Sequence, residues 1–156
     1  MILSDREIRA ALARHALRIT PDPPAQSWTS TAVDLRLAKE LVLWKAAKGK
    51  RMVCPFDAEY DYEDVKERFS RQLQMQQSGY VIKPQTFLLG WTIEKLQLPY
   101  QSRLAARVEG KSSLARLGIG VHVTAPTIHA GFGYARDNEQ YPGSPLQLEI
   151  WNIGPL

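Results

Sequence analysis

The sequence predicts a mainly β protein built as an antiparallel sandwich or barrel. After Gly79, short apolar segments recur between Gly, Pro and Ser residues, a rhythm that is typical of such folds. Helical periodicity is confined to short stretches at the N-terminus and near residue 65. With 156 residues, the chain is long enough for one domain with its own hydrophobic core.

The first segment, "SDREIRAALARHAL", predicts a helix. Ser4 and Glu7 have the spacing of a capping box, and an apolar face begins at Ile8 and continues to about His15. Proline is excluded from helix interiors and central strands, so the helix must end before the prolines at positions 21, 23 and 24.

A strand, a basic turn and a second helix are expected next. Apolar residues alternate with polar or small ones from Val33 to Leu43, as in a half-buried strand. "KAAKGKR" reads as a basic turn and "DAEYDYED" as a solvated loop. The four-residue spacing of Val65, Phe69 and Leu73 predicts one short amphipathic helix.

The C-terminal half contains five candidate strands. They are "YVI", "TFLLGWTI", "RLAARVE", "IGVHVTA" and "LQLEIWN". A polar segment with three glycines, from Gly131 to Pro145, predicts a long loop that joins two of these strands.

Charge and composition narrow the function classes. The net charge is +4, which suits a polyanionic ligand, although an ordinary solvated surface explains it equally well. The basic residues are scattered, so no nucleic-acid partner is expected. The single cysteine rules out an intramolecular disulfide framework. Charge appears within five residues of the N-terminus and apolar runs are short, so we expect a cytoplasmic protein without a membrane partner.

The turn "EGKSSLARLG" concentrates hydroxyl groups and cations. Gly110 frees the backbone, and hydrogen-bond donors suited to a phosphate chain follow at Lys111, Ser112, Ser113 and Arg116. A P-loop would need a glycine at position 105, and a nucleophile elbow would need one at position 114, where this chain has alanine and leucine. From these residues alone, a strand-end turn with exposed cations is the preferred interpretation, and a phosphate-binding turn is the alternative.

Four motifs together carry a family resemblance. "RVEGKSSLARLGIGVHVTAPTIHAGF" followed by "LQLEIWN", with "ILSDREIRAAL" and "TSTAVDLRL" before them, resembles the dCTP deaminase branch of the dUTPase-like superfamily. The resemblance covers most of the chain apart from the acidic middle segment and the long loop. It implies a dUTPase-like distorted β-barrel, β-clip or jelly-roll-like, with an N-terminal helix and one or two short helices. It also implies a homotrimer with sites between subunits, which bind dCTP or dUTP with Mg²⁺ carried on the triphosphate.

The resemblance also implies a set of site residues. The hydroxyl-rich turn would contact the triphosphate, "HVTA" would offer its backbone to the base, Phe132 would lie against the deoxyribose, and Glu149 would be the catalytic glutamate. Strand alternation puts Gln147, Glu149 and Trp151 on one face, so Gln147 joins the expected site. The nucleotide-binding set is therefore Lys111, Ser112, Ser113, Arg116, Val123, Thr124, Ala125, His129, Phe132 and Gln147.

The implied reaction is hydrolytic removal of the 4-amino group of dCTP, which gives dUTP and ammonia. Zinc deaminases carry His-x-Glu and Pro-Cys-x-x-Cys, and this chain has neither motif, so a metal-free route is expected. In that route Glu149 shuttles protons, Ser112 helps to hold the water, and Arg116 supports the pair electrostatically. The alternatives are a dUTP pyrophosphatase or bifunctional enzyme that forms dUMP, and a non-catalytic nucleotide-binding module.

The chain departs from the family pattern in three places. His129 occupies the position of a family aspartate that activates water in dUTPases, which argues against dUTP pyrophosphatase activity and leaves contact with the 3′ hydroxyl open. The 131–145 loop is longer than the corresponding turn, so it either covers the site or decorates the rim. Residues 1–156 end at "NIGPL", whereas family members continue, so we expect one domain without the C-terminal strand pair and tail.

Overall fold

The protein is built on one antiparallel sheet. The computed structural model describes residues 1–45, 53–121, 124–136, 138 and 140–155. The main sheet has the strand order β3-β2-β4-β8-β6, with β1 also paired to β4, and a small second sheet joins β5 to β7. The strands are β1 (Arg18–Thr20), β2 (Leu37–Trp44), β3 (Ser70–Gln74), β4 (Thr86–Gln97), β5 (Ala106–Arg107), β6 (Ile119–Val121), β7 (Thr127–Ile128) and β8 (Ser144–Asn152).

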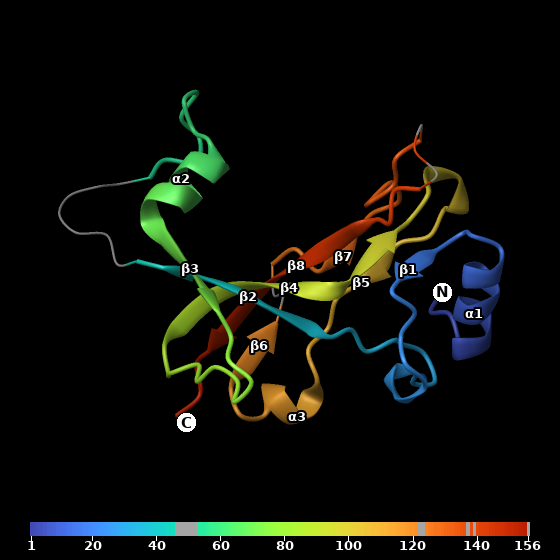
Figure 1. Cartoon of the computed structure of the whole chain (residues 1–156), viewed down its shortest axis with the longest axis horizontal. Helices are drawn as coiled ribbons and strands as arrows, with labels where there is room; N and C mark the ends of the chain where they lie inside the picture. The colour runs from blue at the N-terminus through green and yellow to red at the C-terminus, as the bar shows by residue number, and fades with distance from the viewer. Residues whose placement is uncertain (46–52, 122–123, 137, 139, 156) are drawn as a thin grey trace.

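The predicted fold class, mainly β with an N-terminal helix and short further helices, is confirmed. The helices are α1 (Asp5–Ala13), α2 (Tyr62–Phe69) and α3 (Ser112–Ala115), with 3-10 turns at Ala25–Ser27 and Tyr100–Ser102. The long strands β4 and β8 cross the middle of the molecule, and α1 and α2 lie at opposite ends (Figure 1). Among the described residues the two edge strands, β3 and β6, do not pair with each other, so the sheet is open and not a closed barrel.

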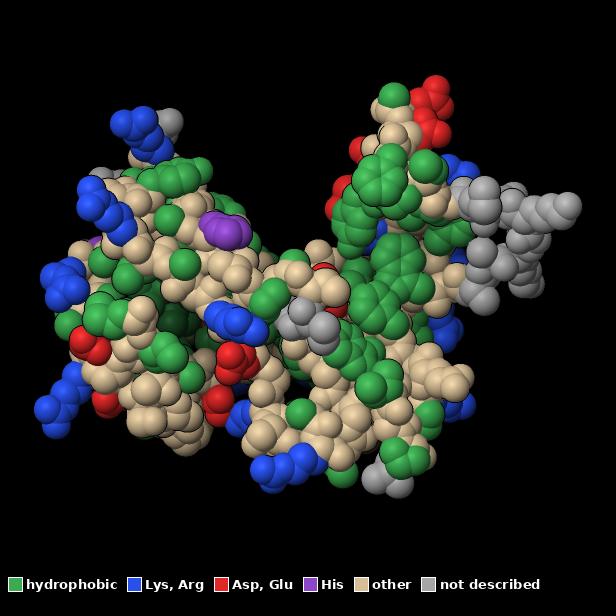
Figure 2. Space-filling model, turned by 180° about the vertical axis from the view of Figure 1, so that it is seen from behind, with side chains coloured by type: hydrophobic (Ala, Val, Ile, Leu, Met, Phe, Trp, Pro, Cys, Tyr) green, Lys and Arg blue, Asp and Glu red, His purple; other side chains and the backbone are tan. Residues whose placement is uncertain are grey.

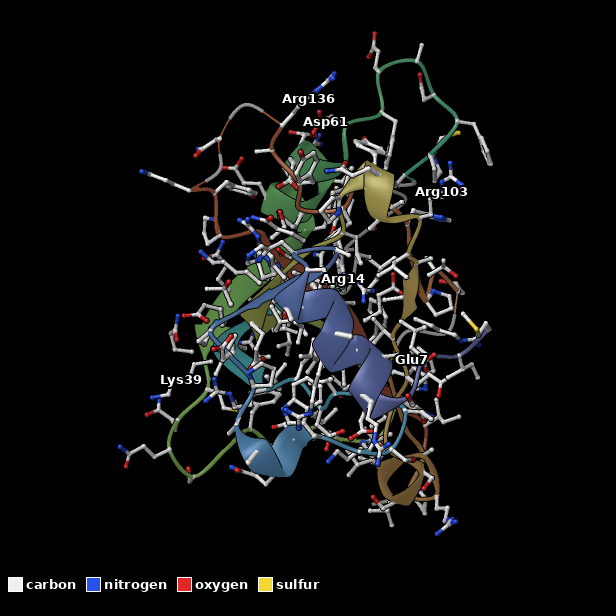
Figure 3. The ribbon with its side chains drawn as sticks, turned by 90° about the vertical axis from the view of Figure 1, so that its right-hand side faces the viewer. Glu7, Arg14, Lys39, Asp61, Arg103 and Arg136 are labelled. Atoms are coloured by element: carbon white, nitrogen blue, oxygen red, sulfur yellow. The ribbon has the colours of Figure 1, made fainter. Side chains whose placement is uncertain are left out.

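Helix α1 begins with the predicted capping box. The Glu7 backbone N–H donates to the Ser4 hydroxyl, and the Ser4 backbone N–H donates to Glu7 Oε2 at 2.7 Å. Figure 3 shows Glu7 and Arg14 at the two ends of this helix. The helix ends at Ala13, slightly earlier than expected, because His15 adopts a left-handed conformation with φ of 55°.

Strand β2 begins at Leu37, four residues later than the alternation predicted. Val33 makes an isolated bridge with Trp28 instead of joining the sheet. The register against β4 shifts between Leu37 and Leu41, so one period-2 pattern spans two differently paired segments.

The second helix differs from the prediction at both ends. It begins inside the acidic segment, because the Asp61 side chain accepts the Asp64 backbone N–H at 2.9 Å and so caps the first turn. It ends at Phe69, and Leu73 belongs to β3, because Ser70 turns the chain into extended conformation opposite Trp44. The expected basic turn lies mostly in residues 46–52, outside the described residues.

The later strands were predicted with unequal success. β4 and β8 contain the predicted "TFLLGWTI" and "LQLEIWN" segments, and each is longer than its motif. "YVI" forms no strand. The Asn152 side-chain amide donates to the Ile82 carbonyl at 2.7 Å, so this segment is attached to β8 by a side-chain hydrogen bond and not by strand pairing. "RLAARVE" contributes only β5, and the described part of "IGVHVTA" contributes β6. The 131–145 loop ends at Ser144, where β8 begins.

The register of β4 and β8 separates two faces of the sheet. Leu88 lies opposite Ile150 in one core cluster, and both side chains are buried. One residue later on β4 and one residue earlier on β8, Leu89 lies opposite Glu149 on the other face. Seen from behind, the surface is hollowed between a lobe rich in Lys and Arg and a lobe with acidic side chains at its tip (Figure 2). Within the described ranges, each helix is too short or too polar to cross a lipid bilayer.

Candidate functional site

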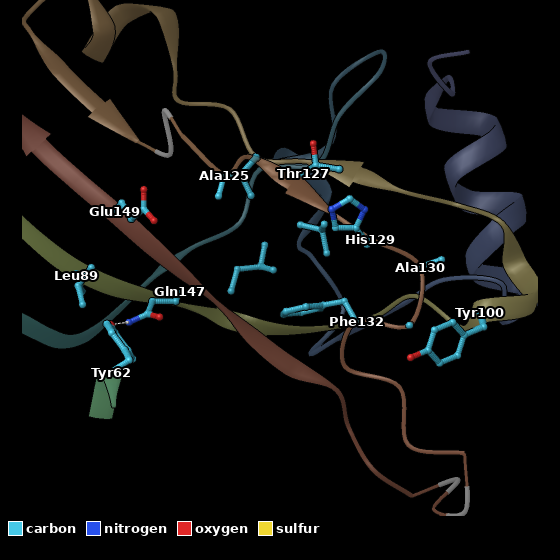
Figure 4. Close-up of a pocket in the computed structure, with 14 residues that line it drawn as sticks. Tyr62, Leu89, Tyr100, Ala125, Thr127, His129, Ala130, Phe132, Gln147 and Glu149 are labelled. Carbon is cyan, nitrogen blue, oxygen red and sulfur yellow. Dashed lines mark hydrogen bonds between the residues drawn. The ribbon is translucent and has the colours of Figure 1, made fainter. Parts of the chain in front are cut away.

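A cleft of roughly 620 Å³ opens on the face of the sheet that carries Glu149. Its polar side chains are Thr127, His129, Gln147 and Glu149, together with two tyrosines. They come from α2, the 3-10 turn near residue 100, β7 with the loop that follows it, and β8 (Figure 4). The chain thus brings together residues that are far apart in the sequence.

Glu149 lies in the middle of β8 and is half-buried. The hydroxyl of Thr124, which lies in the segment between β6 and β7, donates a hydrogen bond to Glu149 Oε2 at 3.4 Å. A carboxylate in a cleft with an apolar wall can take and return a proton when a substrate is bound beside it.

Gln147 lies two residues before Glu149, on the same face of β8. Its Nε2 donates to the phenol oxygen of Tyr62 at 3.3 Å. Tyr62, Leu89, Tyr100 and Val108 line the cleft but were not among the predicted site residues. No local pattern could have revealed Tyr62, because 85 positions separate it from Gln147.

Phe132 supplies the apolar wall at the other end of the cleft. It packs against the buried cluster that contains Ile128 and Leu146, which line the cleft as well. The Leu98 backbone N–H donates to the Phe132 carbonyl at 2.9 Å. Gly131 has φ of +97°, and a Cβ there would stand 2.3 Å from the Tyr100 ring, so the chain turns tightly before Phe132.

His129 and Ala125 complete the part of the predicted site that lies in the cleft. The His129 side chain is exposed, and Figure 4 shows it beside Ala130, near Thr127. Val123 lies outside the described residues. The structure therefore groups the following predicted residues in or beside one cleft: Thr124, Ala125, His129, Phe132, Gln147 and Glu149.

The predicted phosphate turn is separate from this cleft within one chain. Lys111, Ser112, Ser113 and Arg116 are all exposed, and none of them lines the cleft. Lys111 Nζ pairs with Asp34 Oδ2 at 2.5 Å. The end of the turn is fixed against the C-terminal segment, since the Ile153 backbone N–H donates to the Gly118 carbonyl at 2.9 Å.

Metal ligands do not gather in the described part of the chain. No group of three His, Cys, Asp or Glu side chains there could hold an ion. The polar chemistry available in the cleft is therefore that of a carboxylate, a carboxamide, an imidazole and hydroxyl groups.

Comparison with known proteins places this chain in one family. A family model described as dCTP deaminase-like matches residues 2–156. The chain belongs to the dCTP deaminase-like family.

The sequences of related proteins align with almost the whole of this chain. A "dCTP deaminase, dUMP-forming" of Methanobrevibacter smithii is 32% identical over 99% of this chain and 71% of its own length. A protein of the same name from Methanothermobacter thermautotrophicus is 36% identical over 99% of this chain and 70% of its own length. A "dCTP deaminase" of Rhodospirillum rubrum is 30% identical over the full chain and 74% of its own length.

A solved structure is also similar. The crystal structure of 2′-deoxycytidine 5′-triphosphate deaminase from Agrobacterium tumefaciens matches with a TM-score of 0.64 and 25% identity. The match covers 97% of this chain and 41% of that one. The dUTPase-like fold expected from the sequence is confirmed, with an open sheet where a barrel was expected.

Proposed function

We propose that this chain catalyses the hydrolytic deamination of dCTP to dUTP and ammonia. The observation that carries the proposal is the position of Glu149, a half-buried carboxylate that lines a cleft with an apolar wall in a dCTP deaminase-like chain. The relatives are named dCTP deaminases, which supports the deamination step. The cleft, at roughly 620 Å³, lies in the size range of small-molecule sites.

Glu149 acts as the proton shuttle in this reaction. It accepts a proton from water as the water oxygen attacks C4 of the pyrimidine, and it passes that proton to the ring nitrogen N3. Glu149 then takes the remaining proton of the new C4 hydroxyl and delivers it to the amino group, so that the C4–amino bond breaks, ammonia leaves and the C4 carbonyl of dUTP forms. A positioned general base of this kind contributes about 10²- to 10⁴-fold in rate.

The proposed site is completed by a second subunit of a homotrimer. Lys111, Ser112, Ser113 and Arg116 lie outside the cleft of their own chain, which supports a site assembled between neighbours. In that assembly the turn contacts the triphosphate, which arrives with Mg²⁺ as part of the substrate. Ser112 holds the attacking water, and Arg116 supports Glu149 electrostatically.

The remaining roles concern the nucleoside. The backbone of Val123, Thr124 and Ala125 contacts the base, and Phe132 lies against the deoxyribose and disfavours a ribose hydroxyl. His129 replaces the usual aspartate near the 3′ hydroxyl and offers a ring nitrogen as donor or acceptor. Phe132 and His129 both line the described cleft, which supports these assignments.

The test is ammonia release from dCTP and Mg²⁺. Glu149→Gln should lower turnover at least about 100-fold because the amide cannot accept a proton, while dCTP affinity stays within about threefold. A variant that still deaminates would require a different proton shuttle. A wild-type chain whose melting temperature rises with dCTP but which releases no ammonia would be a nucleotide-binding module.

A second candidate function is the bifunctional reaction that continues from dUTP to dUMP. The names of the methanogen relatives favour it. His129 in the aspartate position argues against it. Anion-exchange analysis of the products from dCTP and from dUTP decides between the two, since only the bifunctional enzyme releases pyrophosphate.

A further inference from the structure

We propose that Tyr62 is a positioning residue of this site, whose phenol fixes the carboxamide of Gln147 so that the amide oxygen offers a hydrogen-bond acceptor to the bound nucleotide. The proposal rests on the proposed function, because it assigns the cleft a deoxycytidine nucleotide. It concerns a residue outside the motifs that carried the family resemblance.

The contact itself defines the orientation of the amide. Gln147 Nε2 donates to the Tyr62 phenol oxygen at 3.3 Å, and both side chains line the cleft. Figure 4 shows the amide nitrogen of Gln147 turned toward Tyr62 and the amide oxygen turned away from it. A carboxamide can present either its oxygen or its NH₂ group after rotation about one bond, and in this structure the phenol oxygen engages the NH₂ group and leaves the amide oxygen on the other side.

Tyr62 is held in place by the same sheet that carries Gln147. Helix α2 starts at Tyr62 because Asp61 caps it. The Ser70 hydroxyl donates to the Lys66 carbonyl at the end of the helix, and β3 pairs from there with β2. Since β2 and β8 both pair with β4, helix α2 and Gln147 are attached to one platform.

A cation also restrains the Tyr62 ring. Lys66 Nζ lies 5.5 Å from the ring centroid and is ion-paired with Glu63. An ammonium over an aromatic face is attracted to it, which limits the rotation of the ring. The tyrosine is therefore a defined partner for Gln147, although 37% of its surface is exposed.

An acceptor at Gln147 would read a hydrogen-bond donor of the nucleotide. The nucleoside part of dCTP carries two kinds of donor, the 4-amino group of the base and the 3′ hydroxyl of the sugar. The product dUTP has a carbonyl oxygen in place of the amino group and so lacks the first donor. A site that hydrogen-bonds a donor rejects an analogue without it, because its own polar group is then left unpaired.

The first experiment compares two tyrosines of the same segment. Tyr62→Phe removes the phenol oxygen and keeps the ring, and Tyr60→Phe is the matched control, since Tyr60 is also 37% exposed and does not line the cleft. Tyr62→Phe should raise KM for dCTP about three- to tenfold with kcat within about twofold. Tyr60→Phe should change neither constant, and both variants should keep the wild-type melting temperature.

A double-mutant cycle shows whether Tyr62 acts through Gln147. In a Gln147→Leu background, Tyr62→Phe should have no further effect on KM, because the group that it positions is gone. Additive effects of the two substitutions, or a Tyr62→Phe variant with wild-type KM, would overturn the proposal.

The two donor sources are separated by binding three nucleotides to the Glu149→Gln protein with and without Tyr62→Phe. If the amide reads the 4-amino group, affinity falls for dCTP and for 2′,3′-dideoxycytidine triphosphate but not for dUTP. If it reads the 3′ hydroxyl, affinity falls for dCTP and dUTP but not for the dideoxy nucleotide. An equal loss for all three nucleotides would indicate a merely structural role and overturn the proposal.

Failure of the proposed function has a different signature. A wild-type chain that binds these nucleotides without releasing ammonia overturns deamination alone, and the binding comparison still decides the role of Tyr62. A chain that binds none of them overturns both proposals. NMR of the ligand-free chain tests the contact directly: Tyr62→Phe should move the Gln147 side-chain amide signals, and Tyr60→Phe should not. Unmoved signals would overturn the proposal.

Discussion

The Thr124 hydroxyl donates a hydrogen bond to Glu149 Oε2 at 3.4 Å. Thr124 follows β6 and Glu149 lies on β8, so the contact joins two segments of the cleft. The hydrogen bond restrains the carboxylate that the proposed reaction uses as its base. Hydrogen bonds of this length in a ligand-free site often shorten when substrate binds.

Thr124→Val should therefore weaken catalysis without removing the base. The substitution keeps the β-branched shape and removes the hydroxyl, and we expect kcat for dCTP to fall about three- to tenfold. Thr20→Val, on β1 and away from the cleft, is the control. Steady-state ammonia release measures both variants, and an unchanged kcat in Thr124→Val would show that Glu149 needs no restraint from this side.

The ion pair between Lys111 and Asp34 should compete with the triphosphate. Asp34→Asn frees the Lys111 ammonium, so Kd for dCTP should fall about two- to fivefold at low salt, as expected for a partly exposed pair. The gain should shrink at high salt, where the charges are screened. Glu109→Gln, which breaks the nearby exposed pair with Arg107, is the control. Weaker binding in Asp34→Asn would mean that the aspartate positions Lys111 for the phosphates.

A second ion pair is anchored on strand β4 and should matter for stability. Glu94 is 1% exposed, and Arg36 reaches it with Nε at 2.6 Å and with its backbone N–H at 2.8 Å. Arg36→Met removes the side-chain partner and leaves a buried carboxylate with the backbone contact. We expect a loss of about 2–3 kcal/mol in the free energy of unfolding, measured by urea denaturation.

The control for Arg36 is Arg68→Met. Arg68 pairs with Asp64 at 2.8 Å, and both side chains are more than half exposed. Its removal should cost about 0–1 kcal/mol. Equal losses in the two variants would show that burial of Glu94 is not what makes its pair important.

The N-terminal capping box should make stability depend on pH. The backbone N–H and the hydroxyl of Ser4 both donate to Glu7, and they hold the pKa of Glu7 below its ordinary value of 4.5. Because the pKa is lowered in the folded state, this stabilisation is present above the unfolded pKa and is lost as pH falls through the folded pKa. Ser4→Ala should therefore lower the melting temperature near neutral pH, and the difference should narrow in acid. A gap that stays constant with pH would assign the effect to the lost hydrogen bond between the Glu7 backbone N–H and the Ser4 hydroxyl alone.

Several features were predictable because neighbours in the sequence decide them. The capping box of Ser4 and Glu7 needs one helical turn, and the shared face of Gln147 and Glu149 needs only the alternation of an extended strand. Both predictions are confirmed. The start of α2 was not predicted, because the charged residues around Asp61 indicated a solvated loop. The structure shows that the Asp61 carboxylate accepts the Asp64 backbone N–H and so caps a helix.

The sequence by itself determined a mainly β chain, its family, the N-terminal helix and the strand that carries Glu149. These features could be predicted because hydrophobic periodicity, helix capping and motif order depend on residues that are close together in the sequence. Tertiary structure alone decided that Tyr62 meets Gln147 and that the turn with Lys111 lies outside the cleft. Such contacts depend on how β2, β4 and β8 pair across long separations. Such long-range pairing depends on how the apolar side chains of all strands are buried together, so the pairing cannot be predicted from any one short segment.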